Sequence, residues 1–290
     1  MLSDIKSNSK KVDKFLKSYF RKQDFSNLIL PMKYGTLDSG KKIRSSIILN
    51  TARIFKLNFN QVINICAAVE CIHSYSLIHD DLPCMDNDKI RRGKPSTHIK
   101  FGESTAVLAG NSLLTLAFEM IADSNYLIDN KLKIELIRKL AICSGHTGIA
   151  GGQELDLSYE NKKRNFNQII DMQRNKTGKL FNFCCFSVGV VAKRNVKEKK
   201  FLSKLGEEIG LLFQLADDFI DVKGSKKLAG KPIKKDKKKG KSTLISLIGY
   251  KNAQIFANNL RKNILRKLSK HGKKAEDLIN TVEFIMKRNF

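Results

Sequence analysis

The chain has 290 residues, 42% of them hydrophobic, and carries 54 lysines and arginines against 28 aspartates and glutamates, a formal net charge of +26. This length suffices for a substantial core, and we expect residues 1–290 to form one domain. The charge has two interpretations: a surface for nucleic acid, anionic lipid or phosphorylated substrates, or compositional drift towards lysine. With no CxxC pair, no visible signal peptide and no apolar run long enough to span a bilayer, we expect a cytoplasmic protein with reduced thiols.

Helical periodicity dominates the chain, and strand patterns are scarce. The expected helices cover residues 4–24, 41–56, 60–80, 103–124, 130–145, 165–191, 196–222, 250–270 and 274–288. No proline occurs between Pro95 and Pro232, as long helices require. Because the helices near 60–80, 165–191 and 196–222 are apolar on most faces, we predict an all-α, single-domain bundle of about ten helices around a deep central cavity. Its polar mouth should lie at the C-terminal ends of two central helices.

Three segments interrupt the helical pattern. Residues 82–97 contain two prolines and a glycine and are expected to form a loop. Residues 144–156 are rich in small side chains, which let a backbone or a ligand approach closely. Residues 223–241 are rich in lysine and are expected to form an exposed, mobile loop.

The first cluster of acidic side chains lies at the end of the expected apolar helix 60–80. Asp80, Asp81, Asp86 and Asp88 lie within nine residues, where they repel one another and the helix C-terminal dipole. A divalent cation relieves both effects, and oxygen-only ligands favour Mg²⁺. Asp80 and Asp86 diverge around a straight helix unless Pro83 breaks it. The alternative is a solvated acidic loop beside an arginine pair.

The second cluster interrupts the apolar run LLFQLADDFIDV. Asp217 and Asp221 are four residues apart and therefore share one helix face. Aspartate is a poor helix former, and a buried carboxylate without a partner is costly. An amphipathic helix edge would explain Asp218 but not all three aspartates. The pattern thus favours a second metal-binding wall.

Basic residues accompany both acidic clusters. They are Lys41 and Arg44 at a helix start, the pair Arg91 and Arg92, Lys176 with Thr177, and Lys231 and Lys241 around the lysine-rich segment. Singly, each would be an ordinary surface charge. Together with two carboxylate clusters they indicate a site for two diphosphates, one bridged to the acids by metal and one held directly by Arg and Lys.

These motifs resemble those of the trans-isoprenyl diphosphate synthase family. DDLPCMDNDKIRRGKP and FQLADDFID look like its two aspartate-rich motifs, and GKKIR, GGQELD, Lys176-Thr177 and GKP…DKKKGKST are similar to its other landmarks. The resemblance covers roughly residues 25–290 and is greatest to the bacterial farnesyl diphosphate synthase group. It implies the isoprenoid synthase fold, Mg²⁺ as cofactor (several ions, with Mn²⁺ as a possible substitute) and a homodimer.

The resemblance also implies a role for individual residues. Metal ligation falls to Asp80, Asp86 and Asp217, with Asp221 as a further candidate and Asp81 in support. Allylic diphosphate binding falls to Arg91, Lys176, Thr177, Gln214, Lys231 and Lys241. Isopentenyl diphosphate binding falls to Lys41, Arg44, His73 and Arg92. Gln153 and Asp156 match a further motif, in which Asp156 would reach metal-bound water. Tyr75, with Ser76, would close the floor of the pocket and limit the product to fifteen carbons. The alternative for His73 and for Tyr75 is ordinary core packing.

The implied chemistry is ionisation of the allylic diphosphate followed by attack of the isopentenyl double bond, assisted by metal and by the Arg/Lys clamp. No Ser–His–Asp or Cys–His signature is evident. Three other functions remain open at this point. A longer-chain synthase would share every catalytic residue, and a terpene cyclase would usually lack the second aspartate-rich motif. A basic helical nucleic-acid-binding protein would leave both acidic clusters unexplained.

Overall fold

Helices make up most of the described structure, which is a computed structural model covering residues 2–37, 40–223 and 241–287. In chain order they are α1 (Leu2–Arg21), α2 (Ile29–Thr36), α3 (Ile43–Ile54), the 3₁₀ turn η1 (Phe59–Gln61), α4 (Ile63–Asp80), α5 (Thr97–Phe101), α6 (Glu103–Ala122), α7 (Asn130–Ser144), α8 (Ile149–Ser158), α9 (Phe166–Gln173), the π-helix η2 (Arg174–Gly178), α10 (Lys179–Val191), α11 (Val196–Lys223), α14 (Leu244–Ile248), α15 (Tyr250–Ser269), the 3₁₀ turn η3 (Gly272–Ala275) and α16 (Glu276–Lys287). The predicted all-α fold is confirmed.

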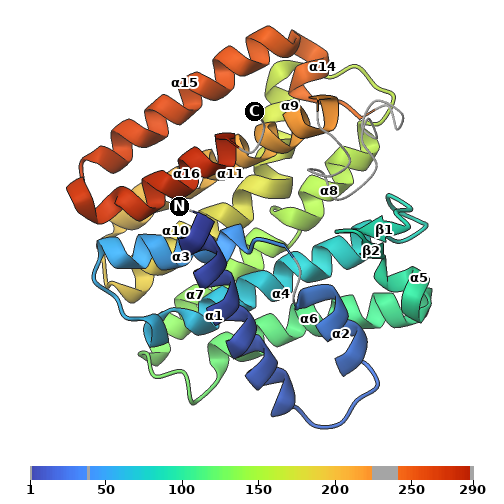
Figure 1. Ribbon diagram of the computed structural model, residues 1–290, viewed down its shortest axis with the longest axis vertical. Helices are drawn as coiled ribbons and strands as arrows, with labels where there is room; N and C mark the ends of the chain where they lie inside the picture. The colour runs from blue at the N-terminus through green and yellow to red at the C-terminus, as the bar shows by residue number, and fades with distance from the viewer. Residues whose placement is uncertain (1, 38–39, 224–240, 288–290) are drawn as a thin grey trace.

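The central helices pack unusually closely. α4 lies along α6, and α10 lies along α11 (Figure 1). A Cβ atom added at Gly206 of α11 would lie 2.2 Å from the carbonyl oxygen of Phe181, and one at Gly210 would lie 2.8 Å from the Cα of Gly178. Glycine at these two positions therefore allows the backbones of α10 and α11 to touch. This contact fixes the direction of the α11 segment that carries the second aspartate cluster.

The outer helices cover this centre with one apolar face each. In α1, Val12, Leu16 and Phe20 recur every four residues and are buried, whereas Lys10, Lys11 and Lys14 are exposed. α1 packs on α3 and α4, and α15 and α16 close the opposite side against α11. In Figure 1, α15 runs along the upper edge of the molecule, far from α6.

The helical pattern differs from the expected one at five places. Residues 165–191 form α9, η2 and α10 in unbroken succession, so a π-helical turn lies inside the expected helix. Residues 144–156, expected to be irregular, include most of α8. The short helices α2, α5 and α14 were not expected, because eight residues or fewer show little periodicity. Apart from Lys223 and Lys241, the lysine-rich segment lies outside the described residues.

The expected loop 82–97 contains a small antiparallel hairpin. Strand β1 (Ile90–Arg91) pairs with β2 (Lys94–Pro95), with Ile90 opposite Pro95 and Arg91 opposite Lys94. The two turn residues, Arg92 and Gly93, both have positive φ, at 54° and 76°. Two such residues define the tight turn that best matches the twist of paired strands. The hairpin therefore holds Arg91 and Arg92 in a fixed direction.

One described helix, α6, is long and apolar enough to cross a membrane by these two criteria alone. Core helices of globular proteins meet the same criteria. α6 packs against α2, α4, α5 and α7 and so belongs to the helical bundle.

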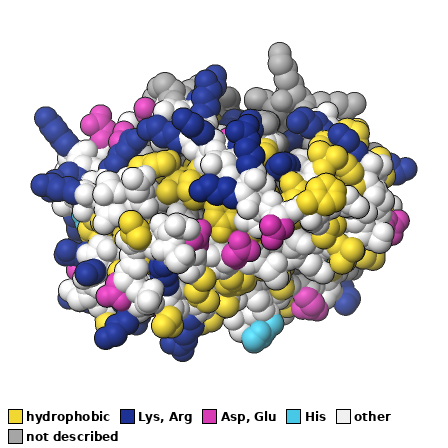
Figure 2. Space-filling view, turned by 90° about the horizontal axis from the view of Figure 1, so that it is seen from below, with side chains coloured by type: hydrophobic (Ala, Val, Ile, Leu, Met, Phe, Trp, Pro, Cys, Tyr) yellow, Lys and Arg dark blue, Asp and Glu magenta, His cyan; other side chains and the backbone are white. Residues whose placement is uncertain are grey.

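The basic side chains are spread rather than gathered. On the face shown in Figure 2, Lys and Arg occur at the edges and across the middle, interrupted by acidic and apolar side chains. On this face the charge fits a compositional excess better than one concentrated binding surface.

The six cysteines are free thiols, and all except Cys84 are buried.

Candidate active site

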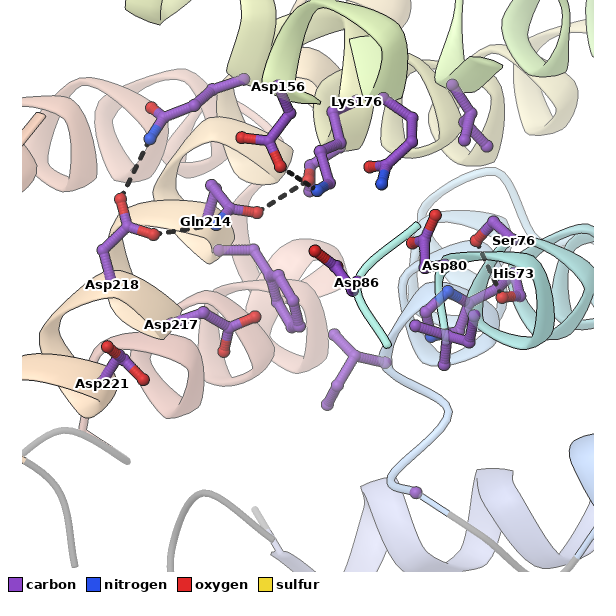
Figure 3. A pocket seen from close by; sticks show the side chains of 18 of the residues that line it. His73, Ser76, Asp80, Asp86, Asp156, Lys176, Gln214, Asp217, Asp218 and Asp221 are labelled. Carbon is purple, nitrogen blue, oxygen red and sulfur yellow. Dashed lines mark hydrogen bonds and ion pairs between the residues drawn. The ribbon is translucent and has the colours of Figure 1, made fainter. Parts of the chain in front are cut away.

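A pocket of about 440 Å³ lies between the C-terminal ends of α4 and α11. It brings together the following predicted site residues: Lys41, Arg44, His73, Ser76, Asp80, Asp86, Arg91, Arg92, Gln153, Asp156, Lys176, Thr177, Gln214, Asp217, Asp221 and Lys241. Tyr75 and Asp81 are not part of its lining as described, and Lys231 lies outside the described residues. Figure 3 shows Asp80 and Asp86 on one side of the pocket and Asp217 and Asp221 on another.

The first acidic wall forms where α4 ends. Asp80 is the last residue of the helix, and the chain then turns back so that the amide of Asp86 donates to the carbonyl of Asp80 at 2.8 Å. The helix thus stops before Pro83, and both carboxylates reach the pocket. Burial raises the pKa of Asp80 to about 6, and Asp86 adds to the rise while Lys176 opposes it. A cation in the pocket would offset this cost.

The neighbouring carboxylate, Asp81, is not part of the pocket lining. One residue further around the helix end, it faces away from the pocket, and its buried carboxylate accepts hydrogen bonds from Nε and Nη2 of Arg91. Arg91 also reaches Asp88 at 3.4 Å. Asp81 is therefore a buried anchor for the hairpin arginine and not part of the pocket wall. That Asp81 supports the metal ligands Asp80 and Asp86 stays a prediction.

The second acidic wall comes from the last two turns of α11. Asp217 and Asp221 lie one turn apart and line the pocket, as their spacing predicted. Figure 3 shows the carboxylate of Asp217 directed towards the side that carries Asp86. Asp218 is 3% exposed and is held by two glutamine side chains, Gln173 and Gln214.

The start of α3 supplies two cations to the pocket. Lys42, which precedes the helix, has the left-handed conformation (φ 44°) and turns its side chain inward, where Nζ donates to the carbonyl of Thr36 at 2.8 Å and pairs with Asp13 at 3.2 Å. Its neighbours Lys41 and Arg44 line the pocket. The Arg44 guanidinium lies 4.9 Å from the ring centre of Phe181 and 5.6 Å from that of Phe213. These rings hold an otherwise flexible cation in place.

Arg92 and His73 form a hydrogen-bonded pair in the pocket. Arg92 Nη2 lies 3.3 Å from His73 Nε2. Because a guanidinium group only donates, Nε2 accepts, which assigns the ring proton of neutral His73 to Nδ1. Burial lowers the pKa of His73 well below its ordinary value, and nearby Arg44 and Arg92 lower it further. His73 is therefore a neutral ring that orients Arg92.

The π-helix presents Lys176 to a buried carboxylate. Lys176 Nζ lies 2.6 Å from Asp156 Oδ2, and Lys241 Nζ reaches the same oxygen at 2.9 Å and Asp86 Oδ1 at 3.1 Å. Burial alone would raise the pKa of Asp156, but the two lysines bring it below its ordinary value. Asp156 thus pairs with two lysines, and its expected contact with a metal-bound water stays a prediction.

Several pocket residues were not singled out from the sequence. Glu70, buried in α4, accepts from the backbone and hydroxyl of Ser45 at 3.1 and 2.7 Å and so anchors the start of α3. The sequence could have identified Glu70 as a pocket residue, because Glu70 lies three residues before His73 and ten before Asp80 on one helix face. The sequence gave no such indication for Gln173 and Lys42, since their roles depend on contacts with other helices.

Tyr75 does not line the pocket as described. Its ring packs edge-on against the ring of His79 at a centroid distance of 5.2 Å.

The carboxylates do not form a metal cage by themselves. Within the described part of the chain, no three His, Cys, Asp or Glu side chains are grouped closely enough to hold a metal ion. Magnesium commonly takes only one or two carboxylates and completes its shell with substrate phosphates and water. Two acidic walls on opposite sides of one pocket are compatible with that mode of binding.

The comparison of the sequence with known proteins and the comparison of the structure with solved structures find the same class of proteins. The polyprenyl synthetase family matches residues 26–282. The farnesyl diphosphate synthases of Escherichia coli (strain K12) and Buchnera aphidicola subsp. Schizaphis graminum are 37% and 39% identical, over 97% and 99% of this chain and 96% and 98% of their own. An FPP/GFPP synthase from Zymomonas mobilis superposes with a TM-score of 0.86 at 33% identity, covering 99% of this chain and all of the other. The geranyltransferase of Helicobacter pylori complexed with magnesium and isoprenyl diphosphate gives 0.82 at 29% identity, covering 98% and 96%.

Proposed function

This chain belongs to the polyprenyl synthetase family, and we propose that it condenses isopentenyl diphosphate with dimethylallyl or geranyl diphosphate, head to tail and in trans, to give farnesyl diphosphate and inorganic diphosphate. One observation carries the proposal: two aspartate-rich segments, 129 or more residues apart in the chain, line one pocket together with basic side chains from α3, the hairpin and η2. The similarity of farnesyl diphosphate synthases over almost the whole chain supports the same activity.

The basic side chains suggest where each substrate binds. Lys41, Arg44 and Arg92 converge on one side of the pocket and are assigned to the diphosphate of isopentenyl diphosphate, with His73 orienting Arg92. Lys176 lies on the other side and is assigned to the allylic diphosphate. The remaining residues assigned to the allylic group are Arg91, Thr177, Gln214, Lys231 and Lys241. Most of these cations are already held by protein contacts, which lowers the entropy lost when a diphosphate binds.

The acidic walls have the donor set of a magnesium site. Asp80 and Asp86 on one wall, and Asp217 and Asp221 on the other, offer only oxygen ligands. The Oδ1 atom of Asp221 is buried and has no hydrogen-bond partner among the described residues, so it has room for a cation. Bound Mg²⁺ would supply charge that stabilises the diphosphate as a leaving group. Several ions, and replacement by Mn²⁺, belong to the same proposal.

The chain's own side chains do the rest of the chemistry. When the allylic C–O bond breaks, negative charge develops on the diphosphate, and Lys176 and Lys241 stabilise it from fixed positions. Positive charge develops on the allylic carbon, which Met172 and Phe213 shield from water on the apolar side of the pocket. The isopentenyl double bond then attacks this carbon, and a proton passes to the departing diphosphate. No side-chain nucleophile is required.

We further propose that the enzyme is a cytoplasmic homodimer. The exposed apolar side chains of α5, α6 and α7, among them Ile99, Leu108 and Ile134, offer a surface that a second copy could cover. Molar mass by light scattering at micromolar concentration tests this: twice the 32.8 kDa of one chain is expected, and the mass of one chain would count against it.

The activity is tested by incubating the protein with dimethylallyl and isopentenyl diphosphates, with and without Mg²⁺, and sizing the dephosphorylated products. Fifteen-carbon product that appears only with the metal is expected. The variants Asp80→Asn and Asp217→Asn, one from each wall, should each lose at least a hundredfold in rate. Products of twenty carbons or more would indicate a longer-chain synthase. Absence of any prenyl product, together with salt-sensitive retention of nucleic acid on a filter, would indicate the binding protein instead.

A further inference from the structure

A chain of hydrogen bonds crosses from η2 to α11 along the wall of the pocket. The hydroxyl of Thr177 donates to Gln214 Oε1 at 2.8 Å, and Gln214 Nε2 donates to Asp218 Oδ1 at 2.9 Å. Gln173 Nε2 donates to the other oxygen of Asp218 at 3.0 Å. Figure 3 shows Asp218 directed towards these amides, on the far side from Asp86, while Asp217 is directed into the pocket.

The charge of Asp218 sets the direction of every bond in this chain. An ionised carboxylate only accepts, so both glutamines must turn their NH₂ groups towards it. Gln214 then presents its oxygen to Thr177, and the Thr177 hydroxyl must donate to that oxygen. The hydroxyl proton of Thr177 is thereby committed to the protein. Without Asp218, either orientation of the Gln214 amide would be open.

The same contacts hold the π-helical turn in place. Gln173 precedes the turn and Thr177 lies within it, four residues on, and their partners on α11, Asp218 and Gln214, are also four residues apart. Two adjacent turns of one helix are thus bonded to two adjacent turns of the other. π-Helical turns are rare and occur frequently at functional sites. This one carries Lys176 into the pocket, where its Nζ meets Asp156.

From this arrangement we propose that Asp218 is a positioning residue for the allylic diphosphate and not a metal ligand: acting through Gln214 and Gln173, it orients the Lys176–Thr177 segment. The inference rests on the proposed function, since it concerns one of its two diphosphate sites. It separates the three aspartates of the second acidic cluster into two roles. All three line the pocket, but both carboxylate oxygens of Asp218 already accept hydrogen bonds from glutamine amides, whereas Asp217 is directed towards the side that carries Asp86.

The test uses Asp218→Asn, which keeps the shape of the side chain. It replaces one of the two oxygens that accept from the glutamines with an NH₂ group, which donates. We expect the KM for dimethylallyl diphosphate to rise about tenfold, the size of one charge-assisted hydrogen bond lost. The KM for isopentenyl diphosphate and the Mg²⁺ concentration for half-maximal rate should stay within about twofold of wild type. Asp217→Asn, the matched control one residue away, should instead shift the Mg²⁺ dependence.

A second variant covers the case in which Asp218→Asn does not fold. Gln173→Met removes one donor, keeps the volume, and leaves all pocket-facing aspartates intact. We expect a smaller rise, about threefold, in the KM for dimethylallyl diphosphate, with the KM for isopentenyl diphosphate unchanged. The double variant should be less impaired than the product of the single effects, because both substitutions break one chain.

Three results would overturn the inference. They are a shift of the Mg²⁺ dependence in Asp218→Asn as large as in Asp217→Asn, an equal rise of both KM values, and lowered thermal stability with both KM values unchanged. All are read against a wild-type enzyme that makes prenyl product. If the wild type makes none, it is the proposed function that fails, so the two failures are distinguishable.

Discussion

Lys241 holds the place of a cation between two carboxylates of the pocket, so its removal should tighten metal binding. Its Nζ lies 3.1 Å from Asp86 Oδ1 and 2.9 Å from Asp156 Oδ2, and the three side chains are only 8–12% exposed. Burial alone would lower the pKa of Lys241, but Asp156 and Asp86 raise it above its usual value, so the lysine is charged. Any divalent ion that uses Asp86 must displace or repel this charge. We therefore expect Lys241→Met to bind Mn²⁺ more tightly when no diphosphate is present.

The distances set the size of the effect. Two unit charges about 3 Å apart interact by about 5 kcal/mol at an effective dielectric constant of 20. Desolvation of the partly buried pair cancels much of this attraction, which leaves about 1–2 kcal/mol. Since 1.4 kcal/mol corresponds to a factor of ten, Mn²⁺ affinity should rise about 5- to 30-fold. Affinity for the allylic diphosphate should fall, because the same lysine is assigned to that group.

The assay is titration of Mn²⁺ followed by the electron paramagnetic resonance signal of the free ion, at constant ionic strength. Lys270→Met is the matched control, because Lys270 is exposed at the end of α15 and its removal changes the net charge equally. Mn²⁺ binding that is equal in the two variants, or weaker in Lys241→Met, would show that Lys241 does not compete for the metal site.

Three further predictions follow from individual side chains. Because the pKa of Asp80 is raised to about 6 from 3.8, the folded protein binds more protons than the unfolded chain between these values, and stability falls as pH rises through that window. Asp80→Asn should therefore raise the melting temperature of the metal-free protein by a few degrees at pH 8, a gain of about 1–3 kcal/mol, and by much less at pH 4; an equal gain at both pH values would refute the cause. Gly152→Ala places a Cβ 2.1 Å from the backbone nitrogen of Lys176, so α8 and η2 must separate, and we expect a loss of about 2–4 kcal/mol in urea unfolding, against little change for the exposed control Ala150→Ser. Tyr75→Ala should yield products longer than fifteen carbons by chromatography if Tyr75 limits the chain; an unchanged product profile, which its packing against His79 would allow, removes it from that role.

Much of the fold could be predicted because it depends on local patterns. Apolar periodicity and the proline-free stretch located the long helices, and the spacing of Asp217 and Asp221 put both on one face of α11. The end of α4 before Pro83 could also be predicted from the sequence, since proline cannot continue a helix and restrains the residue before it. The short helices and the π-helical turn could not be located, because a single turn leaves too few residues to reveal a period.

The roles of neighbouring residues could be predicted less well. Asp80 and Asp81 are adjacent and chemically identical, yet one lines the pocket and the other binds Arg91. Side chains of successive helix residues point about 100° apart, so the side chains of Asp80 and Asp81 point in different directions. The sequence alone does not tell which of the two directions leads into the pocket. Lys41 and Lys42 are likewise adjacent and both line the pocket, yet Lys42 pairs with Asp13 whereas Lys41 lies over the ring of Phe284.

The sequence by itself determined the chemistry of this protein: which acids, which bases, and on which helices they lie. The tertiary structure alone decided which partner each side chain meets, as when Lys241 bridges Asp86 and Asp156 or Asp218 receives two glutamines from different helices. The physical reason is that periodicity encodes the face of an element on which a residue lies, whereas a hydrogen bond or ion pair acts over about 3 Å. Contacts that short depend on how α8, η2 and α11 pack, and glycines such as Gly152 and Gly210 set that packing.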